Sequence, residues 1–445
     1  MGQANPKIFK SYDIRGIYPD ELNEDAAYLI GRAFAKRALA KEVIVGSDMR
    51  LSGPALKEKL IAGIVDQGVN VIDIGLVPVD AVYFAVGILK YEAGIMITAS
   101  HNPPAYNGFK MVLKDMRWIR GVELRDDVLN FSEPKAERKG EVKALDLTQK
   151  YLDHVLSFCE VKKIKPLKVV VDAGNGMAGK IVPLLQKSLP IKVIPLNFTL
   201  DGNFPAHPSN PLMPESQIQI TQAVKDNKAD FGVIFDGDTD RLFFVDELGQ
   251  FIRADITLLL LAKDLLKREP GQGIAYNLIC SKIVPEKIIE WGGRPIRTKV
   301  GYVFVSAGMR ENGGIMGGEL SAHYSFRDNA YADSGFIALV ILLQLLSKEA
   351  KPLSEIVKPF YKYFKSDEVN IAVTDSQAII NKVKAKYCDG KQDEIDGLTV
   401  EYDNWWFNVR PSNTEPLLRI TVEADSQEAV ENKLMGLVDS ISQSK

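Results

Sequence analysis

The stretch KEVIVGSDMRLSG (41–53) indicates the fold class, because an apolar run there ends in a polar loop and a helical pattern follows it. The apolar run VNVIDIG (69–75) comes next, so the order is strand, loop, helix, strand. That order is typical of a βαβ unit, in which two parallel strands are joined by a crossover helix.

The same plan recurs twice along the chain. The later copies are LKVVVDAGNGMAG (167–179) with IKVIPLN (191–197), and QGIAYNLICS (272–281) with RPIRTKVG (294–301). After each copy, one further apolar strand leads into a polar loop; these elements are GIMITASHNPPAYNG (94–108), FGVIFDGDTDR (231–241) and GGIMGGELSAHY (313–324). Unrelated apolar runs would rarely keep this order three times, so we predict an internal threefold repeat of a mixed α/β domain. Ligands bind such sheets beyond the carboxyl ends of the strands, so the three polar loops are expected to face a shared central cleft.

The end of the chain departs from this plan. From about residue 366 the pattern is strand, helix, strands, helix, and GLTVEYDNWWFNVRPSNTEPLLRITVEAD (397–425) predicts a hairpin. We therefore predict a smaller α+β domain at this end. The expected boundaries are 1–147, 148–248 and 249–365 for the three α/β domains and 366–445 for the C-terminal domain.

Composition excludes several classes of protein. A net charge of −3 argues against a general nucleic-acid binder. The apolar runs, such as 336–346, are too short to span a bilayer, and the first residues lack the apolar core of a signal peptide. Cys159, Cys280 and Cys388 lie far apart, which favours reduced thiols in the cytoplasm.

The first polar loop carries a serine and a histidine in front of two prolines, in the order Thr98, Ala99, Ser100, His101, Asn102, Pro103, Pro104. Proline restricts its own φ and the residue before it, so the loop is expected to be irregular but rigid. Ser100 is then a candidate nucleophile or phosphate carrier, with His101 and Lys110 nearby in sequence. An isolated Ser-His pair is more often an ordinary polar turn, because a base and a nucleophile must also meet in space.

The second loop is an acidic cluster. Asp236, Asp238 and Asp240 alternate between two apolar runs, and three such carboxylates can converge on one hard cation. A solvated acidic turn is the simpler alternative, but its strongly apolar flanks argue against it. A calcium-binding EF-hand loop fits at the aspartates and at Glu247, but it is disfavoured, because Arg241 occupies the position that needs glycine and the flanks are strands instead of helices.

The remaining motifs are weak individually. Glu319, Ser321 and His323 alternate in the third loop, and a Glu carboxylate can accept hydrogen bonds from two neighbouring sugar hydroxyls. Arg410, Ser412, Asn413 and Thr414 combine a guanidinium, two hydroxyls and an amide, which suits a phosphate but also an ordinary turn. Arg15 near the start resembles a surface charge, and Asp48 with Arg50 predicts a loop ion pair.

Together the motifs resemble the α-D-phosphohexomutases, and most of all the phosphomannomutase/phosphoglucomutase branch. TASHNPPAYNGFK (98–110) is similar to the family's phosphoserine loop, DGDTDR (236–241) to its magnesium loop, GGELSAHY (317–324) to its sugar loop and RPSNTEP (410–416) to its phosphate loop. YDIRG (12–16) also fits, and the motifs stand in family order across essentially the whole chain.

The resemblance implies a role for each matching residue. Ser100 would be the phosphorylated serine, and Asp236, Asp238 and Asp240 would hold one Mg²⁺ per chain, with a phosphoserine oxygen as a further ligand. The reacting phosphate would be lined by Arg15, His101, Lys110 and Arg241. The sugar hydroxyls would meet Glu319, Ser321 and His323, and the distant phosphate would be bound by Arg410, Ser412, Asn413 and Thr414.

Two departures from the family pattern stand out. Ala322 replaces the usual glycine of the sugar loop, and alanine is strained there if the position needs a positive φ. Some relatives carry a histidine after the lysine of the loop that here reads Lys299-Val300-Gly301, which leaves Lys299 as a candidate substrate contact.

The implied activity is a reversible interconversion of hexose 1-phosphate and hexose 6-phosphate through a hexose 1,6-bisphosphate, which would also act as activator. Such a scheme needs two phosphate sites and a C-terminal domain that moves while the intermediate turns. The general acid/base remains open between His101 and Lys110.

A phosphoglucosamine mutase, a metal-dependent phosphatase and a non-catalytic sugar-phosphate-binding protein are the alternative functions. The expected partners are small sugar phosphates, with no nucleic acid or membrane, and the chain is expected to be a cytoplasmic monomer or dimer.

Overall fold

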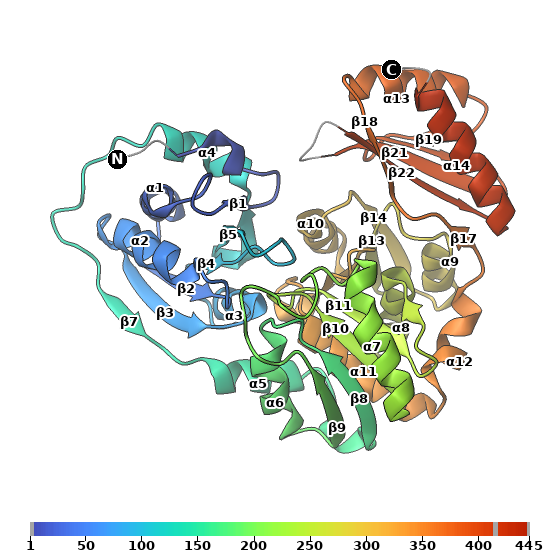
Figure 1. Ribbon diagram of the computed structural model, residues 1–445, viewed down its shortest axis with the longest axis horizontal. Helices are drawn as coiled ribbons and strands as arrows, with labels where there is room; N and C mark the ends of the chain where they lie inside the picture. The colour runs from blue at the N-terminus through green and yellow to red at the C-terminus, as the bar shows by residue number, and fades with distance from the viewer. Residues whose placement is uncertain (1–3, 413–416, 443–445) are drawn as a thin grey trace.

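The structure is a computed structural model that describes residues 4–412 and 417–442. Within these ranges the chain forms four β-sheets with helices packed against them (Figure 1). We refer to the units that carry the sheets as domains I to IV, in chain order. No helix in the described ranges combines the length and the apolar character needed to cross a bilayer.

Domain I contains a seven-stranded sheet in the order β1-β5-β4-β2-β3-β7, with β6 paired to β5. Its strands are β1 (Ile14–Ile17), β2 (Glu42–Ser47), β3 (Asn70–Leu76), β4 (Ala93–Ile97), β5 (Tyr106–Leu113), β6 (Arg117–Ile119) and β7 (Val142–Ala144). Its helices are α1 (Glu24–Ala38), α2 (Gly53–Val65), α3 (Val79–Gly87) and α4 (Gly121–Leu129). Side chains alternate along β2, so Val43 and Val45 pack in the cluster with α1 and α2, while Ile44 packs in the cluster with α3.

Domains II and III repeat this plan with fewer strands. Domain II has the order β12-β11-β10-β8-β9, and domain III has the order β14-β13-β15-β16. Domain II contains α5 (Thr148–Leu156), β8 (Leu167–Asp172), α6 (Ala178–Gln186), β9 (Ile191–Leu196), α7 (Pro214–Asn227), β10 (Phe231–Phe235), β11 (Leu242–Asp246) and β12 (Phe251–Ile252). Domain III contains α8 (Ala254–Arg268), β13 (Gly273–Asn277), α9 (Ile283–Glu290), β14 (Arg294–Thr298), α10 (Tyr302–Asn312), β15 (Gly314–Gly318), β16 (Tyr324–Phe326), α11 (Gly335–Glu349) and α12 (Leu353–Val357).

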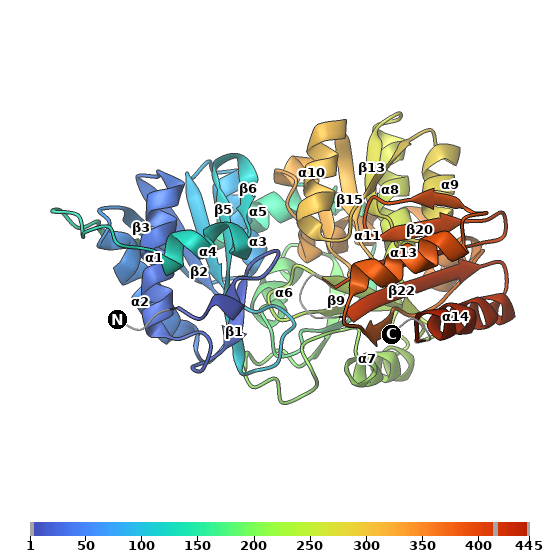
Figure 2. The same cartoon turned by 90° about the horizontal axis from the view of Figure 1, so that it is seen from above.

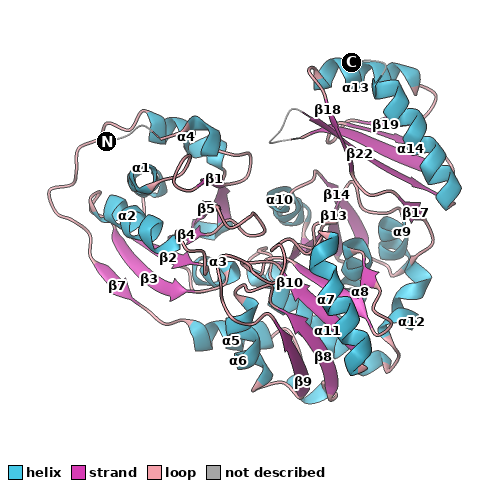
Figure 3. Cartoon of the chain, viewed as in Figure 1, coloured by secondary structure: helices cyan, strands magenta, loops and turns pink. Residues whose placement is uncertain are grey.

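The predicted repeat is confirmed by the strand pairing. Each domain contains a parallel trio whose first strand in sequence lies at the centre; these trios are β4-β2-β3, β10-β8-β9 and β15-β13-β14. In domain I, β7 adds a fourth parallel strand beside β3. In each domain the third parallel strand leads through a polar loop into an antiparallel return strand, which is β5, β11 or β16. The loops that follow β4 and β10 meet near the centre of the molecule (Figure 3).

Domain IV is the predicted α+β unit. Its antiparallel sheet has the order β17-β22-β21-β20-β19, with β18 also paired to β22. The elements are β17 (Phe364–Lys365), β18 (Val369–Ala372), α13 (Ser376–Lys386), β19 (Lys391–Asp393), β20 (Leu398–Glu401), β21 (Trp405–Pro411), β22 (Leu417–Ala424) and α14 (Gln427–Ser442). The predicted hairpin is confirmed, because β21 and β22 pair from Trp405↔Ala424 to Pro411↔Leu418.

The apolar cores separate domain IV from the rest. One continuous cluster of buried side chains runs through domains II and III and takes in α3 of domain I. Domain IV has a cluster of its own, built only from residues between 369 and 441. Seen from above, it lies beside domain III and away from domain I (Figure 2). Domains II and III therefore share one core with part of domain I, and domain IV, whose sheet begins with β17, has a separate core.

Candidate functional site

Ser100 lies at the turn of the loop that follows β4. Its backbone adopts φ +49°, its N–H donates to Thr98 Oγ1 at 2.9 Å, and the residue is 1% exposed. A left-handed φ at a serine costs about 1–3 kcal/mol, and such strain persists only where surrounding contacts enforce it. The loop is therefore held in one conformation with the Ser100 hydroxyl fixed in place.

Arg50 supplies much of that enforcement. Its guanidinium is buried and donates to four backbone carbonyls of the serine loop: Ser100 at 2.8 Å, Asn102 at 2.6 Å, Pro103 at 2.9 Å and Tyr106 at 2.8 Å. The expected ion pair with Asp48 is present, with Arg50 Nε 3.5 Å from a carboxylate oxygen. Sequence analysis missed the larger role of Arg50. Because β2 and β4 are neighbouring parallel strands, the loops that follow them were bound to meet.

The three aspartates converge as predicted. Asp236, Asp238 and Asp240 are buried between β10 and β11, and one carboxylate oxygen from each lies within 4.8 Å of the others. Ser100 Oγ donates to Asp236 Oδ2 at 2.5 Å, so the serine and the acidic cluster form one site.

Lys110 partly neutralises this cluster. Its Nζ donates to Asp238 Oδ2 at 2.8 Å and also bonds Asp240. Burial disfavours the ammonium, but these carboxylates outweigh burial and raise the pKa of Lys110 above its ordinary value. Burial, and then Asp240 and Asp238, raise the pKa of Asp236 well above the usual range. The charge of Asp236 is thus incompletely compensated by Lys110 and Arg241.

The cluster has capacity for a hard cation. Asp238 Oδ1 and Asp240 Oδ1 are buried and have no hydrogen-bond partner among the described residues. Carboxylate oxygens in this number suit Mg²⁺, which prefers oxygen ligands, and a cation would supply the missing positive charge. The residues present therefore fit a divalent metal ion.

Two glycines allow the loops to approach so closely. A Cβ at Gly237 would lie 2.7 Å from the Ser100 carbonyl oxygen, and a Cβ at Gly176 would lie 2.7 Å from the Gly237 carbonyl oxygen. The backbones of the serine loop, the acidic loop and the loop after β8 are therefore stacked directly on one another.

The third loop faces the acidic loop across domains II and III. Ser321 Oγ lies 2.8 Å from His323 Nδ1, and His323 Nε2 lies 3.5 Å from Asp240 Oδ2. Burial lowers the pKa of His323, but the Asp240 carboxylate outweighs burial and raises it to about 9. By contrast burial, together with Arg241 and Arg15, holds the pKa of His101 well below its ordinary value. Burial and the two arginines thus favour the neutral form of His101, whereas Asp240 favours the protonated form of His323.

Ala322 does have a positive φ, as the departure from glycine suggested. Its φ is +65°, its N–H donates to the Glu319 carbonyl at 3.0 Å, and its methyl group is buried in the main apolar cluster. Burial of the methyl group offsets part of the strain. The loop keeps its turn, and the Ala322 carbonyl accepts from Leu242 N at 3.3 Å.

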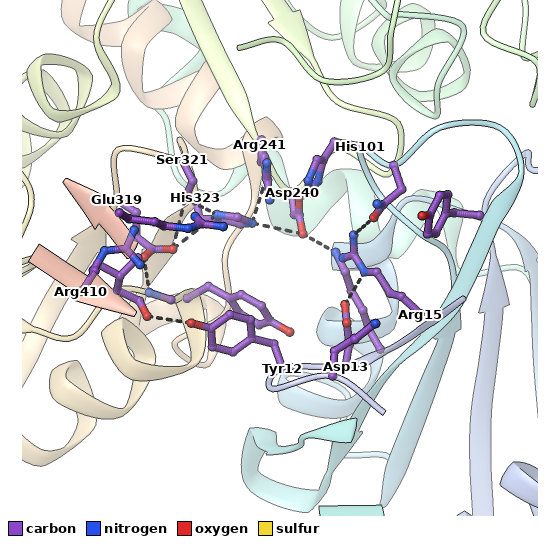
Figure 4. A pocket seen from close by; sticks show the side chains of 18 residues that line it. Tyr12, Asp13, Arg15, His101, Asp240, Arg241, Glu319, Ser321, His323 and Arg410 are labelled. Carbon is purple, nitrogen blue, oxygen red and sulfur yellow. Dashed lines mark hydrogen bonds and ion pairs between the residues drawn. The ribbon is translucent and has the colours of Figure 1, made fainter. Parts of the chain in front are cut away.

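A cavity of about 540 Å³ joins these groups (Figure 4). Its lining includes most of the predicted site residues, namely Arg15, His101, Lys110, Asp240, Arg241, Glu319, Ser321, His323 and Arg410. Arg15 reaches the serine loop, with Nη1 3.1 Å from the Ala99 carbonyl oxygen. Arg241 links the other two loops, since its N–H donates to Asp236 Oδ1 at 3.2 Å and its Nε lies 3.3 Å from His323 Nε2.

At the far end of the cavity two guanidiniums stand side by side. Arg410 on β21 is paired with Arg419 on β22, and both donate to Glu368, at 2.5 Å and 3.0 Å. Like charges directly opposite each other repel, so Glu368 stabilises the pair. Sequence analysis missed Arg419, although counting the register of the predicted hairpin would have placed it opposite Arg410.

Three predicted contacts differ from this picture. Asn413 and Thr414 lie outside the described residues, and of their motif only Arg410, Pro411 and Ser412 are described. Lys299 is exposed and does not line the cavity, because the chain turns so that Val300, Gly301 and Tyr302 face it instead. Tyr302 was not predicted; its ring stacks on His323 with a centroid separation of 5.5 Å.

Comparison with known proteins places nearly the whole chain in one group. Four family descriptions match in succession: "Phosphoglucomutase/phosphomannomutase, alpha/beta/alpha domain I" over residues 6–125, domain II over 149–249, domain III over 253–364 and the C-terminal domain over 368–439. A Xanthomonas campestris protein named "Phosphohexose mutases" is 42% identical, with 95% of this chain and 96% of that protein covered. A "Phosphomannomutase" from Vibrio cholerae is 39% identical, with 95% and 96% covered. The crystal structure of a phosphoglucomutase/phosphomannomutase family protein from Burkholderia thailandensis superposes with a TM-score of 0.91 at 34% identity, with 98% of each chain covered.

Proposed function

This chain belongs to the phosphoglucomutase/phosphomannomutase family, and we propose that it interconverts hexose 1-phosphate and hexose 6-phosphate, with mannose and glucose as the sugars. The observation that carries the proposal is the Ser100 hydroxyl, 2.5 Å from Asp236, beside a cavity whose opposite end holds Arg410. Phosphoryl transfer depends on positioning and charge neutralisation more than on covalent chemistry, and this cavity offers both.

Ser100 is the phosphate carrier in this proposal. A sugar phosphate binds with its own phosphate at Arg410 and its free hydroxyl at phosphorylated Ser100. The hydroxyl attacks the phosphorus and loses its proton, and the Ser100 oxygen leaves, which gives a hexose 1,6-bisphosphate. The bisphosphate turns, its other phosphate returns to Ser100, and the isomer leaves. Added bisphosphate acts as activator because it phosphorylates Ser100 directly.

The surrounding residues divide the work. Arg15, Lys110 and Arg241 offset charge on the reacting phosphate, and His101, with its lowered pKa, is suited to accept the hydroxyl proton. Glu319, Ser321 and His323 contact the sugar hydroxyls. Arg410 with Ser412, Asn413 and Thr414 binds the distant phosphate. Asp236, Asp238 and Asp240, together with a phosphoserine oxygen, would hold one Mg²⁺, which neutralises and polarises the phosphate when bound.

The proposal also covers the setting of the enzyme. All three cysteines are free, which supports a cytoplasmic protein. The ligands it requires are small sugar phosphates, and it needs neither nucleic acid nor membrane. The enzyme is a monomer or dimer in this proposal, with one complete site in each subunit.

The direct test is mass spectrometry of the purified protein combined with rates on three substrates. An added phosphate on the Ser100 peptide and isomerisation of mannose 1-phosphate and glucose 1-phosphate would support the mutase. A higher rate on glucosamine 1-phosphate than on the other two substrates would identify the protein as a phosphoglucosamine mutase instead. Release of inorganic phosphate at the rate of isomerisation would favour a phosphatase, and no turnover would favour a binding protein.

Metal removal is expected to stop the reaction. Treatment with EDTA should lower kcat roughly 10³-fold, because the several kcal/mol of charge stabilisation that a cation supplies is lost. Adding Mg²⁺ should restore the rate and adding K⁺ should not, as followed by a coupled assay of hexose 6-phosphate formation. A rate unchanged by EDTA would contradict the metal assignment.

Arg410→Ala is expected to act on binding. The guanidinium is 4% exposed at the far end of the cavity, so its loss should raise KM roughly 30-fold, as for a charged bidentate contact, and change kcat less than about fivefold. Lys299→Ala is the matched control, because Lys299 is exposed and off the cavity, and its KM should stay near that of wild type. An unchanged KM in Arg410→Ala would remove Arg410 from the phosphate site.

A further inference from the structure

The dipeptide Val300–Gly301, between β14 and α10, is where three parts of the molecule meet. The Val300 N–H donates to Asp396 Oδ2 of domain IV at 3.1 Å. The Val300 carbonyl accepts from the Tyr12 hydroxyl of domain I at 3.0 Å. The Gly301 N–H donates to Glu319 Oε1 at 2.6 Å.

Two of these bonds belong to one rigid unit. The Val300 carbonyl and the Gly301 N–H are the two ends of the same planar peptide, so they move together. Asp396 holds the preceding peptide through the Val300 N–H. Asp396 and Tyr12 therefore fix the orientation of the peptide whose N–H binds Glu319.

The dipeptide has little room to adjust. Gly301 has φ +128°, and a Cβ there would lie 2.9 Å from the Tyr12 ring. Glycine is needed at this φ and at this close approach. The Tyr12 ring therefore covers the dipeptide on the side of domain I, and the opposing contact comes from domain IV.

Glu319 depends on this contact. The residue is 2% exposed, and Oε1 is occupied by Gly301 N–H and by Asn277 Nδ2 at 3.1 Å. Oε2 accepts from Ser321 Oγ at 3.3 Å and lies 3.5 Å from His323 Nδ1, and Glu319 lines the cavity. The bond from Gly301 N–H is the shortest of the contacts to this carboxylate, and hydrogen bonds to a carboxylate are among the strong ones, so it contributes most to how Oε2 is presented.

Domain IV also reaches domain III elsewhere, and those contacts do not lead to Glu319. Asp393 pairs with Arg297 at 2.7 Å, and Glu423 Oε1 accepts from Lys282 N at 2.8 Å. Of these three contacts, the one made by Asp396 continues into the sugar loop.

We infer that Asp396 is a positioning residue through which domain IV controls how Glu319 binds the hexose. When domain IV is docked, Asp396 orients the Val300–Gly301 peptide and Glu319 presents Oε2 to the sugar. When domain IV moves away, this hydrogen bond is lost and the hold on the sugar relaxes, while the phosphate remains with Arg410 in the moving domain. The inference rests on the proposed function, since it takes Glu319 as a sugar contact.

The test compares two ligands by calorimetry on the full chain. Asp396→Ala should weaken binding of glucose 1-phosphate roughly tenfold and change binding of inorganic phosphate less than twofold, because inorganic phosphate has no hydroxyls for Glu319. Asp396→Asn should recover most of the loss, since its amide oxygen still accepts from Val300 N–H. Asp393→Ala, which breaks the neighbouring pair with Arg297, should leave the ratio of the two affinities unchanged.

Other outcomes overturn the inference. Equal losses for both ligands in Asp396→Ala, an unchanged affinity for glucose 1-phosphate, or the same change of ratio in Asp393→Ala would each do so. A matching thermal unfolding midpoint checks that Asp396→Ala is folded, and the asparagine variant gives the test independently. Failure of wild type to bind glucose 1-phosphate would instead reject the proposed function itself.

Discussion

Replacing Ser100 with alanine is expected to abolish isomerisation, with kcat reduced at least about 10⁴-fold, as for loss of a covalent nucleophile. The hydroxyl is the atom that would carry the phosphate, and the loop offers no substitute within reach of Asp236. Binding of glucose 1-phosphate, measured by calorimetry, should change only a few-fold, because the sugar loop and Arg410 stay intact. Mass spectrometry should find no phosphate on the altered peptide.

Ser209→Ala is the matched control. Ser209 is 4% exposed, and its Oγ contacts the same loop through the Asn102 carbonyl at 3.3 Å, but it does not face the aspartates. Its loss should leave kcat within about threefold, the cost of one neutral hydrogen bond. Substantial activity in Ser100→Ala would reject the carrier role for this serine.

Among the substitutions, Gly237→Ala should have the second largest effect on kcat. The added methyl group would lie 2.7 Å from the Ser100 carbonyl oxygen, and this atom is backbone that Arg50 holds in place. The acidic loop must then shift away from Ser100, and a displacement near 1 Å can cost about 10²-fold in rate. We expect kcat to fall by that factor in a standard mutase assay, with KM little changed.

Gly436→Ala is the control, because it adds the same methyl group to a glycine without creating a clash. Gly436 lies within α14, and apart from its chain neighbours and the adjacent backbone of its own helix, no atom of the described residues comes within 4 Å of the position of its Cβ. Its replacement should leave kcat unchanged and stabilise the protein by about 0.5–1 kcal/mol. If Gly237→Ala turned over at the wild-type rate, the stacking of the two loops would have no catalytic role.

The meeting of the three polar loops could be predicted because it follows from the threefold repeat of the α/β domain. Once three βαβ units are recognised, the loop after the third parallel strand of each must lie at the same edge of its sheet. That argument alone brings Ser100, Asp240 and His323 toward one cleft. In the structure Ser100 contacts the acidic loop at Asp236, and His323 contacts the same loop at Asp240. The alternation of the aspartates, with apolar strands on both sides, likewise predicted their convergence.

What could not be predicted depends on contacts between distant elements. Arg50 resembled half of a simple ion pair until the neighbouring loop was in place, and Arg419 needed the hairpin register. Lys299 is turned outward because the next residues are held by Tyr12, Asp396 and Glu319, and no local pattern reports those bonds. The strained backbone at Ala322 could be predicted only on the condition that the position needs a positive φ, because a sequence shows which residue is present but not the φ it adopts.

The separate core of domain IV has a consequence for the cost of motion. Its apolar side chains are buried among themselves, so tilting this domain exchanges hydrogen bonds and ion pairs for water and exposes little hydrocarbon. Separating domain II from domain III would expose the apolar core that they share, which would cost far more free energy. The part of the site around Ser100 is therefore rigid. Domain IV, which carries Arg410 and holds the other end of the substrate, can move by thermal motion alone.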